Sequence, residues 1–386
     1  MDTDIDSLSA NLPDRQFRWH PLLQQWVIIS AATSNRPWSG AVTAAETTDI
    51  PQHDASCYLC PGVTRSSGIV NPDYQGPFAF DNDFPSLTGD SWAEPDASSE
   101  DPFNELQLSM PSAGKCRVLC WSQRHDHTIS DLTPAQVQQV AELWQAEHKH
   151  LSGLNHVAQV VMFENKGMET GTSNLHPHGQ IYALPFVSDN AERMRKAQSE
   201  FYQKHHSGNQ GSSTSDGQGG SANSLLPHLV SRSEYQASHP HSLLIEEGRY
   251  FKTIVPYFAR FAYESWIVPK QPVADFGAMS PQQLSELGRL YQMQCRRYDR
   301  LFARKSPNIT LFHNAPCDAH KDNRHCCFFL AMQPPLRAPD MLKYLAGFES
   351  GAGNIVNPVV PEIAAHRLRA SSSASDSETS NQNGRG

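Results

Sequence analysis

Polar side chains alternate in a short stretch before the middle of the chain, at His176, His178 and Gln180. An apolar run follows directly, Ile181–Pro185, which predicts a strand, and a strand places alternate residues on one face. A neutral imidazole can attack phosphorus, and the phosphoramidate that forms is labile enough to be passed on. The spacing therefore predicts a surface for phosphoryl or nucleotidyl transfer with His178 as its nucleophile.

The neighbours of His178 favour transfer over hydrolysis. An amide at Gln180 can donate a hydrogen bond to a nonbridging phosphoryl oxygen, whereas a histidine there would offer a titratable proton that could assist water. The preceding loop contains Gly171, Ser173 and Asn174, whose backbone and side-chain donors suit the spread charge of a phosphoryl group. From the residues alone, a metal-binding histidine pair or histidines of the core remain alternatives.

The elements that must position these residues occur in two copies. Leu132–Gln145 and Met279–Gln292 each place Thr or Ser before Pro, as at a helix start, and continue with apolar residues at helical spacing. The strand-like runs CRVLCW and ESWIVP precede these helices, and HVAQVVMFEN and PNITLFHN follow them. We expect an α+β fold of two tandem histidine-triad-like units, each a mostly antiparallel sheet with packed helices. Chance similarity between two amphipathic helices is the alternative.

Composition sets the expected boundaries. The segments 206–224 and 371–386 are polar and rich in Ser and Gly, so we expect a disordered linker or loop insertion and a disordered tail. The catalytic unit is then expected at 15–205, and the second unit at 225–370.

The overall composition excludes several classes of protein. No window approaches the roughly 18 apolar residues of a membrane span, and Met1–Asp14 lacks the apolar core of a signal peptide, so we expect a cytoplasmic protein. The net charge of -9 argues against a nucleic-acid surface. The eight cysteines then indicate reduced thiols or metal ligands rather than a disulfide framework.

Longer motifs carry a family resemblance. They are RPWSG (Arg36–Gly40), CYLC (Cys57–Cys60), NPDY (Asn71–Tyr74), NDF (Asn82–Phe84), FENKG (Phe163–Gly167) and HPHGQ. With these motifs the sequence resembles the galactose-1-phosphate uridylyltransferases, of the histidine-triad superfamily, over most of its length. The resemblance implies a homodimer that transfers UMP from UDP-glucose to galactose 1-phosphate in two displacements through a uridylyl-histidine. A related nucleotide-sugar phosphorylase or hydrolase, or a binding protein without turnover, is the alternative.

The same resemblance assigns roles to individual residues. It makes His178 the acceptor of UMP, with Gln180 and Ser173 on the phosphoryl oxygens. The implied substrate contacts beyond these are Asn82 and Asp83 on the ribose, Asn165 on the nucleotide phosphate, Gly171 and Asn174 in the loop, and Arg36 on the sugar phosphate. Near the C-terminus the positions that contact the sugar, often from the partner subunit, are Lys343, Phe348 and Glu349; an ordinary helix end is the alternative there.

The resemblance also implies metal binding. Cys57 and Cys60 form half of a zinc site, and His125 and His176 stand where the family supplies the other two ligands. Two buried thiols with unrelated histidines are the alternative, and His127 competes with His125.

The second half departs from the family pattern. The family holds a second metal, an iron or zinc, with one Glu and three His. Here only His313 matches, because the expected Glu falls on Met194 and the other expected histidines fall on Phe329 and Ala331. We therefore predict that this second metal site is absent. Counting from Phe312 places Cys327 at the position of His178, so the second unit is not expected to do the same chemistry.

Overall fold

The computed structural model describes residues 12–35, 50–90, 106, 108–172, 174–206, 224–318 and 323–372. Two long helices, α2 (Pro134–Ser152) and α5 (Pro281–Leu301), begin where the sequence predicts. Their N-cap residues, Thr133 and Ser280, each accept a hydrogen bond from the backbone N–H of the third helical residue, a glutamine in both cases. Because each glutamine side chain reaches back to the N-cap backbone, both helices start in a capping box.

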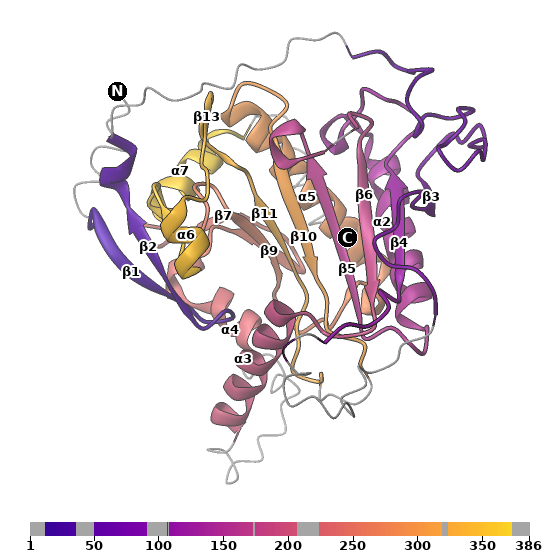
Figure 1. Ribbon diagram of the computed structural model, residues 1–386. Helices are drawn as coiled ribbons and strands as arrows, with labels where there is room; N and C mark the ends of the chain where they lie inside the picture. The colour runs from indigo at the N-terminus through magenta and orange to yellow at the C-terminus, as the bar shows by residue number, and fades with distance from the viewer. Residues whose placement is uncertain are drawn as a thin grey trace.

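A large antiparallel sheet forms the centre of the molecule (Figure 1). Its strands are β3 (Phe78–Asp81), β4 (Lys115–Cys120), β5 (Gln159–Lys166), β6 (His178–Leu184), β7 (Leu244–Glu247), β8 (Phe251–Ile254), β9 (Ser265–Pro269), β10 (Asn308–His313) and β11 (Phe329–Gln333). Within the described residues these nine strands follow the order β3-β4-β6-β5-β10-β11-β9-β8-β7. The strands expected from the sequence are thereby confirmed, and the fold is α+β.

The strand order repeats about the central pair. Outward from β5 the order is β6, β4, β3, and outward from β10 it is β11, β9, β8. In each half a strand, a long helix and two further strands follow one another along the chain, β4-α2-β5-β6 and β9-α5-β10-β11. One continuous sheet therefore joins both halves across β5 and β10; the exact bounds of two units stay a prediction.

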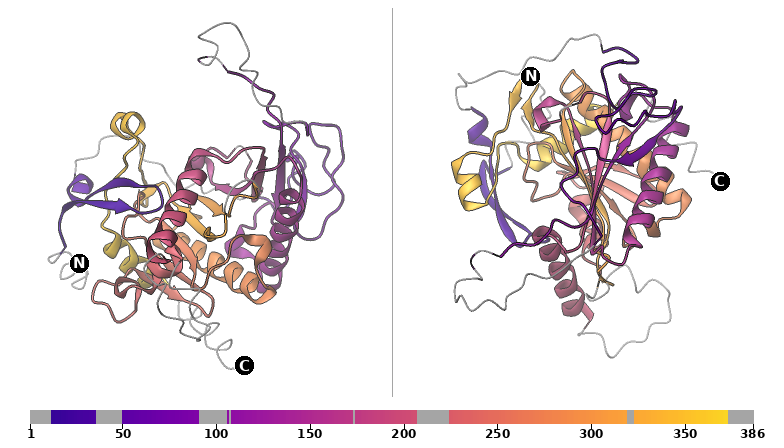
Figure 2. Two further views of the ribbon diagram at one scale, coloured as in Figure 1. Left: turned by 90° about the horizontal axis from the view of Figure 1, so that it is seen from below. Right: turned by 45° about the vertical axis from the view of Figure 1, so that its right-hand side comes forward.

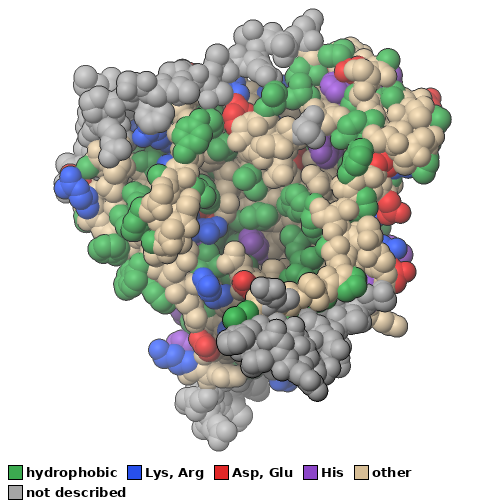
Figure 3. Space-filling view, in the orientation of Figure 1, with side chains coloured by type: hydrophobic (Ala, Val, Ile, Leu, Met, Phe, Trp, Pro, Cys, Tyr) green, Lys and Arg blue, Asp and Glu red, His purple; other side chains and the backbone are tan. Residues whose placement is uncertain are grey.

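Both long helices pack on the same face of this sheet. On β10, Phe312 contacts Trp144 of α2 with ring centroids 4.5 Å apart, and on β5 Glu164 accepts a hydrogen bond from Tyr291 of α5. The other face carries the alternate residues of these strands, among them Phe163, and it is turned toward the viewer in Figure 1. In the space-filling view of that face, hydrophobic side chains and histidines lie over the central strands (Figure 3).

Smaller elements surround the sheet. They are β1 (Arg15–His20), β2 (Gln25–Ser30), β12 (Leu336–Ala338), β13 (Met341–Leu342), β14 (Val356–Asn357), α3 (Asp189–His206), α4 (Leu225–Ser231), α6 (Gly347–Ala352) and α7 (Pro361–Ala370). β14 pairs with β2 in parallel and closes a separate sheet in the order β1-β2-β14. Most of the expected linker and tail, 207–223 and 373–386, lies outside the described residues. A helix long and apolar enough to cross a membrane does not occur in the described part of the chain.

Candidate active site and metal centre

His178 begins β6 on the face opposite the long helices. Its Nδ1 lies 2.7 Å from the backbone carbonyl oxygen of His176. Because a carbonyl can only accept, Nδ1 must carry the hydrogen, and Nε2 therefore presents a lone pair. Burial lowers the pKa of His178, which keeps the ring neutral near pH 7. The ring thus has the tautomer and the charge state of a nitrogen nucleophile.

Register places the expected phosphoryl-binding residues beside this ring. Gln180 lies directly opposite Phe163 in the β5–β6 ladder, so both side chains are on one face, and His178 is on that face too. Asn165 lies two residues after Phe163 on β5 and is therefore on the same face. His178 lies two residues before Gln180 on the antiparallel strand β6. The structure therefore brings His178, Gln180 and Asn165 to one surface.

The two residues expected at the ribose lie at the edge of the same half-sheet. Asn82 follows β3, and its backbone N–H donates to the carbonyl of Cys116 on β4 at 2.9 Å. The Asp83 carboxylate accepts from the backbone N–H of Ser67 at 3.2 Å and pairs with Arg65 at 3.5 Å. These contacts fix the segment after β3, on the side of β4 away from β6.

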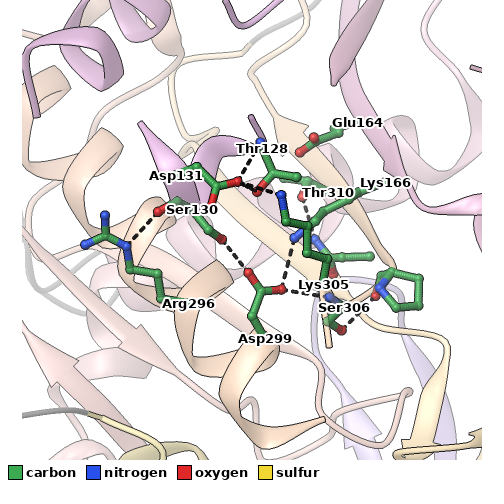
Figure 4. Close-up of polar contacts among 12 residues, drawn as sticks. Thr128, Ser130, Asp131, Glu164, Lys166, Arg296, Asp299, Lys305, Ser306 and Thr310 are labelled. Carbon is green, nitrogen blue, oxygen red and sulfur yellow. Dashed lines mark hydrogen bonds and ion pairs between the residues drawn. The ribbon is translucent and has the colours of Figure 1, made fainter. Parts of the chain in front are cut away.

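The loop after β5 is tied to the helical side of the molecule. Lys166 forms an ion pair with Asp299 near the end of α5 at 3.1 Å, and Asp299 also accepts from the Ser130 hydroxyl at 2.6 Å (Figure 4). Gly171 has a φ of +82°, a left-handed conformation that favours glycine. Two of the predicted site residues, Arg36 and Ser173 of this loop, lie outside the described residues.

The four predicted metal ligands converge. One ligand atom from each of Cys57, Cys60, His125 and His176 lies within 4.8 Å of all the others, and all four residues are buried. The Cys60 sulfur is 3.6 Å from Nδ1 of His125 and 3.4 Å from Nδ1 of His176. Tetrahedral zinc with bonds of about 2.3 Å to sulfur and about 2.0 Å to nitrogen requires edges of about 3.5 Å, so the donor set and its spacing fit such an ion.

Further contacts orient these ligands. The ring of His176 has its Nε2 3.1 Å from the Ser122 carbonyl oxygen, which places the hydrogen on Nε2 and leaves the Nδ1 lone pair toward Cys60. Asn174 donates from its side-chain nitrogen to the Cys57 sulfur at 3.3 Å and accepts from the backbone N–H of His176 at 2.8 Å. Burial lowers the pKa of His176 to about 4, so this ring is neutral as a ligand must be. The cluster therefore fixes the backbone two residues before His178.

The positions expected for a second metal carry other chemistry. Met194 of α3, His313 and Phe329 line one cavity of about 50 Å³ on the face that carries His178. The Phe329 ring stacks on His313 with centroids 4.3 Å apart. Three of the positions that the sequence count assigns to this site therefore line one cavity in the structure. One detail differs from the repeat, because Phe163 lies on the face of His178, whereas Phe312, which is paired with Met162, faces the helices.

The three residues expected at the sugar do not join this surface within one chain. Lys343 and Glu349 pair with each other, while Phe348 is 54% exposed. Both ribbon figures place α6, which carries Phe348 and Glu349, on the far side of the molecule from β6 (Figures 1 and 2). Their expected contact with the sugar therefore stays a prediction.

Comparison with known proteins decides the family. Residues 7–188 match the family model described as galactose-1-phosphate uridyl transferase, N-terminal domain. The galactose-1-phosphate uridylyltransferase of Haemophilus influenzae is 32% identical over 354 residues, which are 92% of this chain and 93% of that protein. The chain belongs to the galactose-1-phosphate uridylyltransferase family. The family expected from the motifs is thereby confirmed.

Solved structures share the fold. A uridylyltransferase structure superposes with a TM-score of 0.67 at 22% identity and covers 92% of this chain and 97% of that one. An ADP-glucose phosphorylase from Arabidopsis thaliana gives a TM-score of 0.68 at 19% identity and covers 92% and 98%. At these identities the likeness concerns the architecture alone, which it places among the uridylyltransferase-like folds.

Sequence reasoning missed the residues behind His178. Gly179 lies against the ring of Trp121, and the Trp121 indole donates to Glu164 at 3.0 Å. Glu164 stands within the FENKG motif, and Trp121 ends the CRVLCW run, but neither received a role. The available signal was the acidic side chain of Glu164 at the position that continues the alternating apolar pair Val160 and Met162 of β5, because such a group is predicted to face the core and to need partners.

Proposed function

We propose that this protein transfers UMP from UDP-glucose to galactose 1-phosphate and that His178 carries the UMP between the two displacements. The observation that carries the proposal is the His178 ring, whose Nδ1–H is taken by the His176 carbonyl while Nε2 lies on the face shared with Gln180 and Asn165. The names of the family and of its relatives supply the substrates.

The chemistry balances in two steps. The Nε2 lone pair of His178 attacks the α-phosphorus of UDP-glucose, a nitrogen–phosphorus bond forms, and the bond to the departing glucose 1-phosphate oxygen breaks. A phosphate oxygen of galactose 1-phosphate then attacks the same phosphorus, and the nitrogen–phosphorus bond breaks. The His176 carbonyl stabilises the positive charge that the ring gains in the intermediate, because Nδ1–H donates to it throughout. The Gln180 amide donates to a nonbridging oxygen.

We propose zinc as the ion for Cys57, Cys60, His125 and His176. The two thiolates and two imidazoles are the donor set that zinc prefers at tetrahedral geometry. All four positions are filled by side chains, so the ion has a structural role, and its effect on catalysis is to fix the backbone leading to His178.

We propose that the functional unit is a homodimer. Lys343 pairs with Glu349, and Phe348 is exposed on α6, which lies at the other side of the view from β6 in Figure 1, so we expect these residues to contact the sugar bound by a second copy. Measuring the mass in solution tests this, and a monomer with full activity would refute it.

Trapping the intermediate tests the nucleophile. Incubation with UDP-glucose labelled in the uridine should leave an acid-labile label on the wild-type protein and on His313→Gln, a matched histidine on the same face of the second half, but not on His178→Gln. A label that survives in His178→Gln, or no label on the wild type, would refute the proposal.

Exchange kinetics, followed by addition of a second acceptor, separate transfer from hydrolysis and from phosphorolysis. With UDP-glucose and labelled glucose 1-phosphate as the sole substrates, a two-step transferase passes label into UDP-glucose at a rate comparable with turnover. A phosphorylase or hydrolase that forms the same intermediate exchanges this label too, so the second acceptor decides: a transferase makes UDP-galactose when galactose 1-phosphate is added, a phosphorylase makes UDP when inorganic phosphate is added, and a hydrolase releases UMP without either. A binding protein would do none of these.

A further inference from the structure

Glu164 is a buried carboxylate whose two oxygens are both taken by neutral donors. It is 2% exposed and lies on β5, on the face opposite His178. One oxygen accepts from the indole N–H of Trp121 at 3.0 Å, and the other accepts from the Tyr291 hydroxyl. The ammonium of Lys166, two residues along the strand, is directed to Asp299 instead. Burial raises the pKa of Glu164, so this arrangement carries an energetic cost that a purely apolar side chain would avoid.

The Trp121 indole transmits this contact to the strand that carries His178. A Cβ built on Gly179 would lie 2.3 Å from Cη2 and 2.9 Å from Cζ2 of Trp121, so the indole fills the space that a side chain would need. The backbone N–H of Trp121 also donates to the carbonyl of Pro177 at 3.2 Å. Trp121 therefore contacts the chain on both sides of His178.

The position of the nucleophile follows this backbone. The His178 ring is bound to the carbonyl of His176, its own chain two residues back, so Nε2 moves with the segment from His176 to Gly179. We infer that Glu164 is a positioning residue for His178, acting through Trp121, whose indole sets how far the start of β6 projects toward the substrate face. The inference rests on the proposed function, because it assigns a task only if His178 is the nucleophile.

The chain contains a matched control. In the second half, Glu264 is 1% exposed and accepts from the indole N–H of Trp266 at 2.9 Å and from the backbone N–H of Arg260 at 2.6 Å. Glu264→Leu removes an equally buried indole acceptor without touching β6. If the two variants lose similar stability, a fall in the labelling rate that occurs only in Glu164→Leu is due to displacement of His178.

The test measures single-turnover labelling of the full-length protein by UDP-glucose as a function of its concentration. For Glu164→Leu and for Trp121→Phe we expect the limiting rate to fall at least about tenfold, because a small misplacement of a reacting atom is costly, while the half-saturating concentration stays within about threefold. Glu164→Gln should stay within about threefold of wild type, because the amide oxygen still accepts from the indole. Glu264→Leu should leave the limiting rate unchanged.

The outcomes are distinct. An equal fall in Glu264→Leu, or an effect confined to the half-saturating concentration, would overturn the positioning role. If Glu164→Leu does not fold, Trp121→Phe decides, and a wild-type limiting rate in that variant overturns the inference. A wild-type protein that takes no label overturns the proposed function and the inference together, whereas normal labelling of both variants overturns the inference alone.

Discussion

Replacing Gly179 by alanine tests the packing behind His178 most directly. The added Cβ would lie 2.3 Å from Cη2 of Trp121, whereas ordinary contacts begin near 3.4 Å, so the two groups must separate by about 1 Å. Trp121 is 1% exposed, and it is bound by Glu164 on one side and contacted by Trp144 at 5.0 Å between ring centroids. Since the indole cannot retreat, β6 must move.

Overpacking of this size costs about 3 kcal/mol of the free energy of unfolding. Trp121→Phe alone costs about 2 kcal/mol, because it leaves a void and removes the hydrogen-bond donor to Glu164. It also withdraws the atoms that meet the new methyl group. We therefore expect the double variant to be at least as stable as Gly179→Ala, with a coupling energy of about 2 kcal/mol.

Urea denaturation followed by far-UV circular dichroism gives the free energy of unfolding of all four proteins of this cycle: the wild type, Gly179→Ala, Trp121→Phe and the double variant. Single-turnover labelling by UDP-glucose, run on the same samples, should show Gly179→Ala slower than wild type. Additive losses of stability, which would leave the double variant about 5 kcal/mol less stable than wild type, would refute the contact between the indole and the glycine as the cause.

Three further predictions follow from single sites. Cys60→Ala removes the sulfur that contacts both histidine ligands, so metal analysis should fall from about one ion per chain to none, and an unchanged content would contradict the assigned ligands. Asp299→Asn leaves the Lys166 ammonium without its carboxylate and should lower the free energy of unfolding, measured by urea denaturation, by about 2 kcal/mol. An unchanged free energy of unfolding would mean that water replaces the ion pair. Burial, with Arg260 nearby, lowers the pKa of His313 to about 3, so this ring is neutral when folded and takes up a proton on unfolding. Its contribution to stability is complete above about pH 6.5 and is lost as the pH falls toward 3, so His313→Gln should flatten the acid limb of the stability curve by about 1.4 kcal/mol per pH unit, and parallel curves would refute the shift.

Local signals predicted the helices correctly because their causes are local. The N-caps of α2 and α5, Thr133 and Ser280, bond within their own first turn, and the proline that follows needs no intrahelical partner for its missing N–H. The helical spacing of the apolar residues then predicts that one face of each helix is buried, but it does not predict which element covers that face. Strand-like runs were assigned for the same reason, since alternation is a property of neighbouring residues.

Register could not be predicted in this way. The parallel between HVAQVVMFEN and PNITLFHN aligns Phe312 with Phe163, but Phe163 lies on the face of His178, whereas Phe312 is turned toward α2. A shift of one residue exchanges the two faces of a strand, and the pairing that decides it depends on residues about 150 positions apart. Asn174 shows a similar limit, because its side chain contacts Cys57 and the backbone of His176 in addition to lying in the predicted phosphate loop.

The sequence by itself determined the chemistry available to this protein. His178 and Gln180 alternate in β6, directly after His176, and with the family motifs around them they indicate the expected nucleophile and metal ligands, because motif and alternation are properties of nearby residues. Only the tertiary structure decided what surrounds that strand. The carboxylate of Glu164 reaches the indole of Trp121 across 43 positions of the chain, and the space for that indole exists because residue 179 has no side chain. Contacts of this kind arise from strand pairing and close packing, which no local pattern encodes.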